Sequence, residues 1–246
     1  MEHTFDDAKA PYWKPQHVQV DSRMREFGHR LLRNFHYVWR HILRDTYNGI
    51  MLRVLARATV LLATLDFEVK RYTMRADDRP TQLPGWEPFE EEIVRVGAVW
   101  VVVCQDLEKG LEVAREHVAS SSQEFRQTET SSTTMASGEE RAHYMILSVK
   151  HIMLCHVTTT TTDQASPFFQ HTAPEPLFNG DSTTCPPSDL ALDYLLWATA
   201  SARPSRISTP IHFLPVELQD EILDHTSFPV APIRKPLLVQ VFFVDG

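Results

Sequence analysis

The amino-acid sequence predicts a mainly α-helical protein: a helical bundle with a long antiparallel helix hairpin, plus an irregular C-terminal section with short helices. Apolar residues recur every three or four positions through long stretches between residues 21 and 157, which is the period of an α-helix. Only 8 of the 246 residues are glycine, and no two lie close enough for a dinucleotide-binding fingerprint or a P-loop. Most of the 16 prolines follow residue 158, which favours an irregular C-terminal part.

The first two helices are expected over residues 21–47 and 50–75. In the first, five apolar residues fall within one narrow arc of a helix: Phe27, Leu31, Phe35, Val38 and Ile42. Asn48 and Gly49 supply a stop, because both residues tolerate the left-handed conformation that ends helices. Two long helices joined by so tight a turn should pack as an antiparallel hairpin.

A third helix is expected from Pro88 to about Val118, and a fourth over residues 139–157. The run Val99–Val103 also has strand propensity, so a buried strand there is the competing interpretation. The helical apolar pattern continues on both sides of this run, and we therefore favour the helix. The polar segment 119–138 is expected to be a mobile loop within the helical body 21–157.

Residues 158–187 are expected to form an irregular linker, because five consecutive threonines and several prolines disfavour a helix there. Ser188 is a suitable N-cap for a fifth helix over residues 190–200. A sixth helix is expected at Val216–Thr226, followed by a proline-rich tail with an apolar run at 237–244. Residues 1–20 form an N-terminal arm in this interpretation.

Bulk composition limits the class of protein. The apolar fraction of 43% and the charged fraction of 23% are typical of a folded globular chain. The acidic start of the sequence does not resemble a signal peptide, and the longest apolar runs are too short for a membrane span. The three cysteines form no CxxC pair. We therefore expect an intracellular protein of the cytoplasm or nucleus that contacts no membrane.

No catalytic or metal-binding signature stands out. There is no GxSxG motif and no HExxH motif, and the 12 histidines do not recur at the spacing of ligands on one helical face. Cys155 and His156 are adjacent in sequence, an arrangement that seldom places a base on its thiolate. The sequence thus favours a non-enzyme with no catalytic residues, no metal and no cofactor.

Charge is distributed unevenly along the chain. Residues 21–57 carry eight arginines against three acidic residues, a net charge of +5, although the whole chain has −8. Four of these arginines project opposite the apolar arc of the first helix and are candidate anion-binding residues: Arg30, Arg33, Arg40 and Arg44. A solvated helix face that pairs with the protein's own acidic residues is the stronger interpretation, since the overall negative charge repels nucleic acid.

The segment LPVELQDEILDH, Leu214–His225, carries the sharpest local motif. Proline presets the first turn of a helix, and the apolar residues could occupy a groove on a partner. The segment resembles the opening of an F-box, the module of ubiquitin-ligase substrate adaptors, and its style also resembles that of filamentous-fungal proteins. The resemblance implies that Leu214, Pro215, Ile222 and Leu223 contact a Skp-type linker protein. Val216 and Leu218, whose apolar side chains could also occupy a groove, complete the set of candidate partner-binding residues.

From these observations we expect a non-catalytic interaction or adaptor protein, related by resemblance to F-box proteins. Two alternatives remain. One is an accessory enzyme or small-ligand-binding helical protein, for example in a fungal biosynthetic pathway, with a pocket lined by Trp39, Trp100 or His151. The other is a binder of phosphate or nucleic acid through the arginine stripe.

Overall fold

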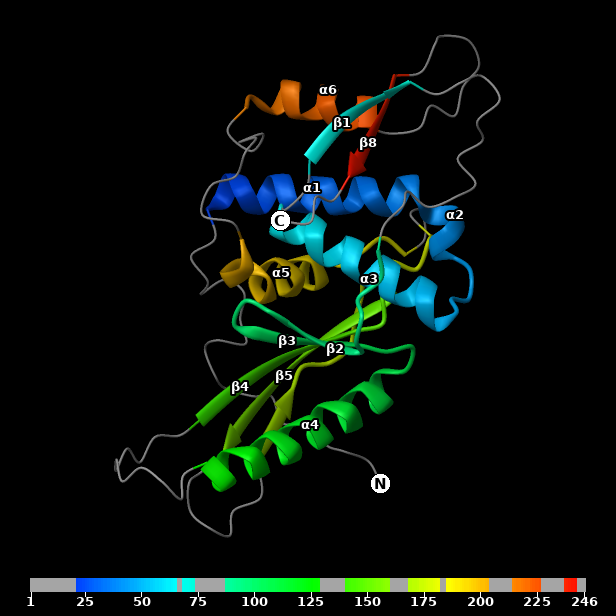
Figure 1. Ribbon diagram of the computed structural model, residues 1–246. Coiled ribbons are helices and arrows are strands. Elements are labelled where there is room, and N and C mark those ends of the chain that lie inside the picture. The colour runs from blue at the N-terminus through cyan, green and yellow to red at the C-terminus, as the bar shows by residue number, and fades with distance from the viewer. Residues whose placement is uncertain are drawn as a thin grey trace.

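The computed structural model describes residues 21–65, 68–73, 87–128, 140–159, 168–181, 185–203, 214–226 and 237–242. These residues form an α/β fold with a mixed six-stranded sheet between two helical layers. Figure 1 shows the helix α4 on one face of the sheet and the helices α1, α3 and α5 on the other. The prediction of a mainly α-helical bundle was therefore wrong.

The sheet has the strand order β2-β3-β4-β5-β6, and the short strand β7 also pairs with β5. All neighbouring strands are antiparallel except β3 and β4, which are parallel. A parallel pair needs a crossover connection, and the helix α4 (Leu107–Thr128) supplies it. The strands are β2 (Ile93–Val96), β3 (Val99–Val103), β4 (Glu140–Leu147), β5 (His151–Thr159), β6 (Phe168–His171) and β7 (Glu175–Pro176).

The expected third helix is instead the β2–β3 hairpin followed by α4. Strand β3 is covered on both faces, since Val101 and Val103 pack into the layer of α1, α3 and α5 whereas Val102 packs under α4. A strand buried on both faces reads as a continuous apolar run and imitates the face of a buried helix. The hairpin turns at Gly97, whose φ of +58° is costly for any residue with a Cβ.

The expected helix over residues 139–157 is likewise wrong, because β4 and β5 form an antiparallel hairpin there. Both faces of this hairpin are buried too: Met145 contacts the layer of α1, α3 and α5, and its neighbour Tyr144 lies under α4. The predicted loop 119–138 is also corrected in part, since α4 continues to Thr128; residues 129–139 lie outside the described part. β6 and β7 come from the region where we expected an irregular linker.

The helical predictions near the N-terminus are closer to the structure. The expected first helix is α1 (Ser22–Val38) with the short α2 (Arg40–Leu43), and the second is α3 (Gly49–Thr64). Asn48 caps α3 by accepting a hydrogen bond from the backbone N–H of Met51 at 2.8 Å. The second helix was predicted too long, because the chain passes into strand β1 (Glu68–Thr73) after α3.

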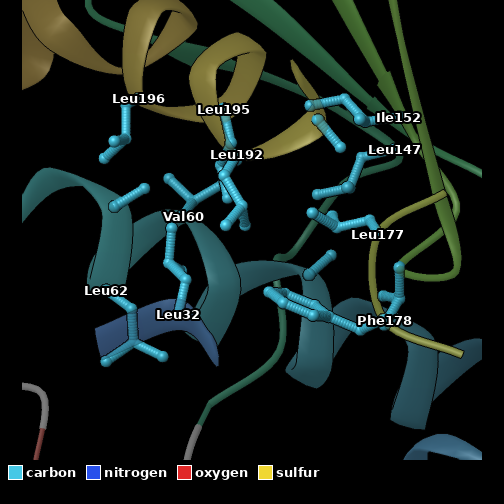
Figure 2. Close-up of a cluster of buried hydrophobic side chains, with 14 of the residues drawn as sticks. Leu32, Val60, Leu62, Leu147, Ile152, Leu177, Phe178, Leu192, Leu195 and Leu196 are labelled. Atoms are coloured by element: carbon cyan, nitrogen blue, oxygen red, sulfur yellow. The ribbon is translucent and has the colours of Figure 1, made fainter. Parts of the chain in front are cut away.

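The helix α5 (Asp189–Ala198) packs against α1, α3 and the sheet, and Ser188 caps it as predicted, 2.9 Å from the N–H of Ala191. Figure 2 shows how tightly this layer interlocks with the sheet. Leu32 of α1, Val60 of α3 and Leu192 of α5 meet at the centre. Leu147 and Ile152 join them from the sheet side, so the main core is apolar and water is excluded from it.

The helix α6 (Val216–Thr226), predicted with these bounds, lies over the far side of α1. Next to it, β1 pairs with β8 (Leu237–Phe242) in a separate antiparallel two-stranded sheet (Figure 1). α6 is therefore attached to the outside of the α/β core, where one of its faces can remain exposed.

Candidate functional site

A groove of about 410 Å³ runs along the border of the sheet at β2. Its lining combines aromatic and aliphatic residues with charged side chains of both signs. The residues that line it are Arg57, Pro88, Phe89, Glu90, Glu91, Ile93, Val94, Arg95 and Trp100.

The groove wraps around the edge of the sheet, because its lining residues come from both faces. Val94 lies opposite Val101 on the face covered by α1, α3 and α5, where Phe89 also packs. Arg95 lies opposite Trp100 on the face covered by α4. A strand placed beside β2 would therefore meet side chains on both of its own faces.

On the α4 side the aromatic wall is held in place by neighbouring groups. The guanidinium carbon of Arg95 lies 5.6 Å from the centre of the Trp100 ring, a cation–π arrangement. Trp100 packs on His117 with the ring centres 4.6 Å apart, and Nδ1 of His117 lies 2.9 Å from the hydroxyl of Tyr144. Burial raises the pKa of Tyr144 to about 12, so this hydroxyl stays protonated at neutral pH.

On the other side the segment before β2 is tied to α3. Arg57 forms an ion pair with Glu87 at 3.2 Å, and Nη1 of Arg53 donates to the backbone oxygen of Glu90 at 2.8 Å. These contacts leave the carboxylates of Glu90 and Glu91 exposed at the start of β2. The lining of the groove thus carries acidic groups before β2 and a basic group, Arg95, within it.

The four arginines predicted to bind anions do not converge on one site. Arg30 forms an ion pair with Asp220 of α6, and Arg33 forms one with Asp189 of α5. Arg40 stacks on Tyr37, 4.5 Å from the ring centre, and Nε of Arg44 donates to the backbone oxygen of Gly180 at 2.8 Å. Three of the four arginines, Arg30, Arg33 and Arg44, therefore join this region to distant parts of the same chain.

One member of this network was missed in the sequence analysis. Asp193 of α5 accepts hydrogen bonds from Nε and Nη2 of Arg25, at 2.6 and 2.5 Å, and lies 2.8 Å from Nε2 of His29. A signal for it exists, since Arg25, His29 and Arg33 recur every four residues on α1, as do Asp189 and Asp193 on α5. Such spacing places each set on one helical face, so the two helices meet through complementary charges.

Burial determines the charge state of this cluster. It lowers the pKa of His29 despite the neighbouring carboxylate, so the imidazole is neutral at pH 7. Burial alone would raise the pKa of Asp193, but the hydrogen bonds from Arg25 and His29 outweigh it and hold that pKa below its ordinary value. The cluster therefore reads as an ionised carboxylate clamped by Arg25, with His29 as a neutral donor.

The structure divides the six residues of the F-box-like segment into two groups. Leu214, Val216 and Leu218 are exposed, at 38%, 47% and 45%, and Pro215 is exposed as well. Leu223 is buried, at 6% exposure, and packs into the main core with the half-buried Ile222 beside it.

Polar contacts hold the inner face of α6 on α1. Asn34 donates to the backbone oxygen of Leu223 at 3.3 Å, and Nη1 of Arg30 donates to the side chain of the buried Gln219 at 3.1 Å. The amide of Gln219 in turn donates to the backbone oxygen of Leu214 at 2.8 Å, which fixes the start of the helix. These contacts hold α6 in place on α1, while Leu214, Val216 and Leu218 at its start remain exposed.

Cys104 and Cys155 show no sign of nucleophilic activation. Burial raises the pKa of Cys104 and of Cys155 to about 12, which keeps both thiols protonated. Among the described residues, no group of three histidine, cysteine or acidic side chains is arranged to hold a metal ion. Of the three residues expected around a ligand pocket, Trp39 is buried in the core, His151 is exposed on β5, and Trp100 lines the groove.

No protein-family model, curated protein or solved structure matches the chain. In the described part of the chain, no helix has both the length and the apolar character needed to cross a membrane.

Proposed function

We propose that this protein is a non-catalytic interaction protein that binds another protein through the exposed residues at the start of α6. The observation that carries the proposal is the exposure of three large apolar side chains, Leu214, Val216 and Leu218, where the chain enters α6, a helix whose inner face is fixed to α1. Large apolar side chains that lie close together in the chain and remain open to water are a common feature of protein contact sites.

The F-box resemblance supplies the candidate partner, a Skp-type linker protein. Contact through Leu223 would require α6 to leave the body, because that side chain is buried in the core. Contact through Leu214, Val216 and Leu218 requires no such rearrangement. The proposal therefore rests on the exposed residues of the segment and not on Ile222 and Leu223.

The test compares two surface variants of the full chain for binding to a purified Skp-type linker protein by isothermal titration calorimetry. The double variant Val216→Glu/Leu218→Glu should weaken binding at least tenfold, because it places charges in the apolar contact. Leu190→Glu is the matched control, since Leu190 is 39% exposed but lies on α5. It should bind within twofold of the parent.

Two results would reject the linker as the partner: no binding by the parent, or equal binding by the double variant and the control. Circular dichroism at 25 °C checks that all three proteins are folded. A substitution at Ile222 or Leu223 is unsuitable here, because it would disturb the packing of α6 on α1 as well as any contact surface.

A further inference from the structure

The strand β2 forms one border of the sheet: within the described residues it pairs with β3 and with no other strand (Figure 1). The backbone N–H of Val103 donates to the backbone oxygen of Glu92 at 2.8 Å, so Glu92 and Val103 form a hydrogen-bonded pair of the β2–β3 hairpin. In an antiparallel ladder, alternate residues turn their backbone groups toward the partner strand. Val94 therefore bonds toward β3, and the backbone groups of Ile93 and Arg95 face away from it.

Charges along this border change sign over a short distance. Glu91 lies two positions before Ile93 and Arg95 lies two positions after it, so all three residues belong to the same face of the strand. When two such strands pair antiparallel about Ile93, Glu91 of each copy lies opposite Arg95 of the other. The same register places two Ile93 side chains together at the symmetry axis, on the face covered by α4.

On the other face of the strand, too, this register brings no two acidic residues opposite each other. Glu92 of one copy comes opposite Val94 of the other, on the face where Arg57 lines the groove. A twofold axis perpendicular to the sheet keeps corresponding faces together, so both α4 helices lie on one side of the joined sheet. The groove residues of each copy then lie beside the incoming strand of the other.

We propose that two copies of this chain associate through antiparallel pairing of their β2 strands, which joins the two sheets into one. The backbone groups of Ile93 and Arg95 face away from β3 and bond to no other strand of the described residues. The charge pattern selects the register centred on Ile93. Short and charged edge strands often prevent such pairing. Here the charges of the two strands attract each other, because every acidic position in this register faces an apolar or a basic one.

Sedimentation equilibrium of the full chain at several concentrations tests the proposal. The parent should show a concentration-dependent mass that approaches twice 28.3 kDa. Arg95→Glu alone and Glu91→Arg alone should each raise the dissociation constant at least tenfold, because like charges then face each other. The combined exchange Glu91→Arg/Arg95→Glu should restore dimer formation to within threefold of the parent.

A second pair of variants tests the backbone contact. Ile93→Pro removes the N–H that faces away from β3 and should abolish dimerisation, whereas Ile93→Ala keeps that N–H and should weaken it less. Ile93→Cys should form an intermolecular disulfide under mild oxidation, since opposed residues of a hydrogen-bonded pair have Cα atoms about 5.5 Å apart.

A mass of 28.3 kDa at every protein concentration up to about 100 μM overturns the proposal, because this concentration lies well above the dissociation constant of a stable dimer. It would leave the β2 border to an extended peptide of another protein. A dimer that persists in Arg95→Glu and Glu91→Arg, or one that the combined exchange does not restore, overturns it as well. The α6 variant Val216→Glu/Leu218→Glu should leave the mass unchanged, which separates this proposal from the proposed function.

Discussion

Gly180 should be among the least replaceable residues of the chain. Its φ is +77°, and a Cβ at this position would lie 2.5 Å from the backbone oxygen of Arg40 and 2.6 Å from the backbone nitrogen of Arg44. The same glycine donates its N–H to Nε2 of the buried His36 at 2.9 Å and accepts from Nε of Arg44 at 2.8 Å. It is therefore the point where the segment after β7 meets α1 and α2.

The cost of Gly180→Ala follows from these contacts. The left-handed conformation costs alanine about 1–2 kcal/mol. The overlap involves backbone atoms, so the segment must move, and the two hydrogen bonds that it would lose contribute about 1 kcal/mol each. We expect the free energy of unfolding to fall by about 3–4 kcal/mol, which corresponds to a drop in Tm of roughly 6–16 °C for a chain of this size.

Urea unfolding followed by circular dichroism measures this loss, and Gly49→Ala is its control. Gly49 is the first residue of α3, and a Cβ there meets nothing within 4 Å. Alanine suits a helix better than glycine, so the control should be neutral or stabilising by up to about 1 kcal/mol. Losses that differ by less than about 1 kcal/mol between the two variants would refute the argument from close packing at Gly180.

Three further results are expected. Burial lowers the pKa of His29 in the folded protein, so the unfolded state binds more protons and the free energy of unfolding should fall as the pH drops below about 6.5. His29→Gln should reduce this pH dependence in urea unfolding between pH 7 and 5. An unchanged slope of stability against pH would count against this role of His29. Burial raises the pKa of Cys104 and of Cys155 to about 12, so both thiols should react slowly with a disulfide reagent at pH 8. The reaction should be at least 100-fold slower in the native protein than in guanidinium, and comparable rates would contradict the burial of these two cysteines. Leu32→Ala should lower the free energy of unfolding by about 2–5 kcal/mol, because Leu32 is fully buried. Leu190→Ala, at an exposed site, should lower it by less than about 0.5 kcal/mol. Equal losses of stability in urea unfolding would contradict the described core.

The first helix could be predicted from the sequence because α1 has one buried face. In α1, Phe27, Leu31 and Phe35 are buried at the positions that the periodicity selects. Local polar signals were equally informative: Asn48 and Ser188 cap α3 and α5 through their side chains. Such features depend on neighbours within one or two turns, and a single sequence records them.

The strands could not be predicted in the same way because both faces of the sheet are covered. Burial on both sides removes the alternation of apolar and polar residues that identifies a strand. In β4, consecutive residues Tyr144, Met145, Ile146 and Leu147 are all buried, so no period remains to be read. The β-branched composition of Val99–Val103 was the better guide to strand structure, and the apparent helical register through it was a coincidence.

The candidate sites differ in the same respect. The exposed apolar residues of α6 belong to one short segment and could be named from the sequence, although the sequence did not reveal that Leu223 is turned inward. The groove at β2 joins Arg57 of α3 to Trp100 of β3, residues that only the folded chain brings together. Recognising it depended on knowing that residues 93–96 form a border strand.

The arginine stripe shows how a conspicuous pattern can have an internal role. Arg25, Arg30 and Arg33 each meet a carboxylate on α5 or α6, helices that come more than 150 residues later in the chain. A protein with a net charge of −8 attracts polyanions poorly, and neutralising these arginines internally weakens that attraction further. The same ion pairs position α5 under α1 and α6 above it. The positive charge of the N-terminal region thus contributes to the assembly of the helical layers.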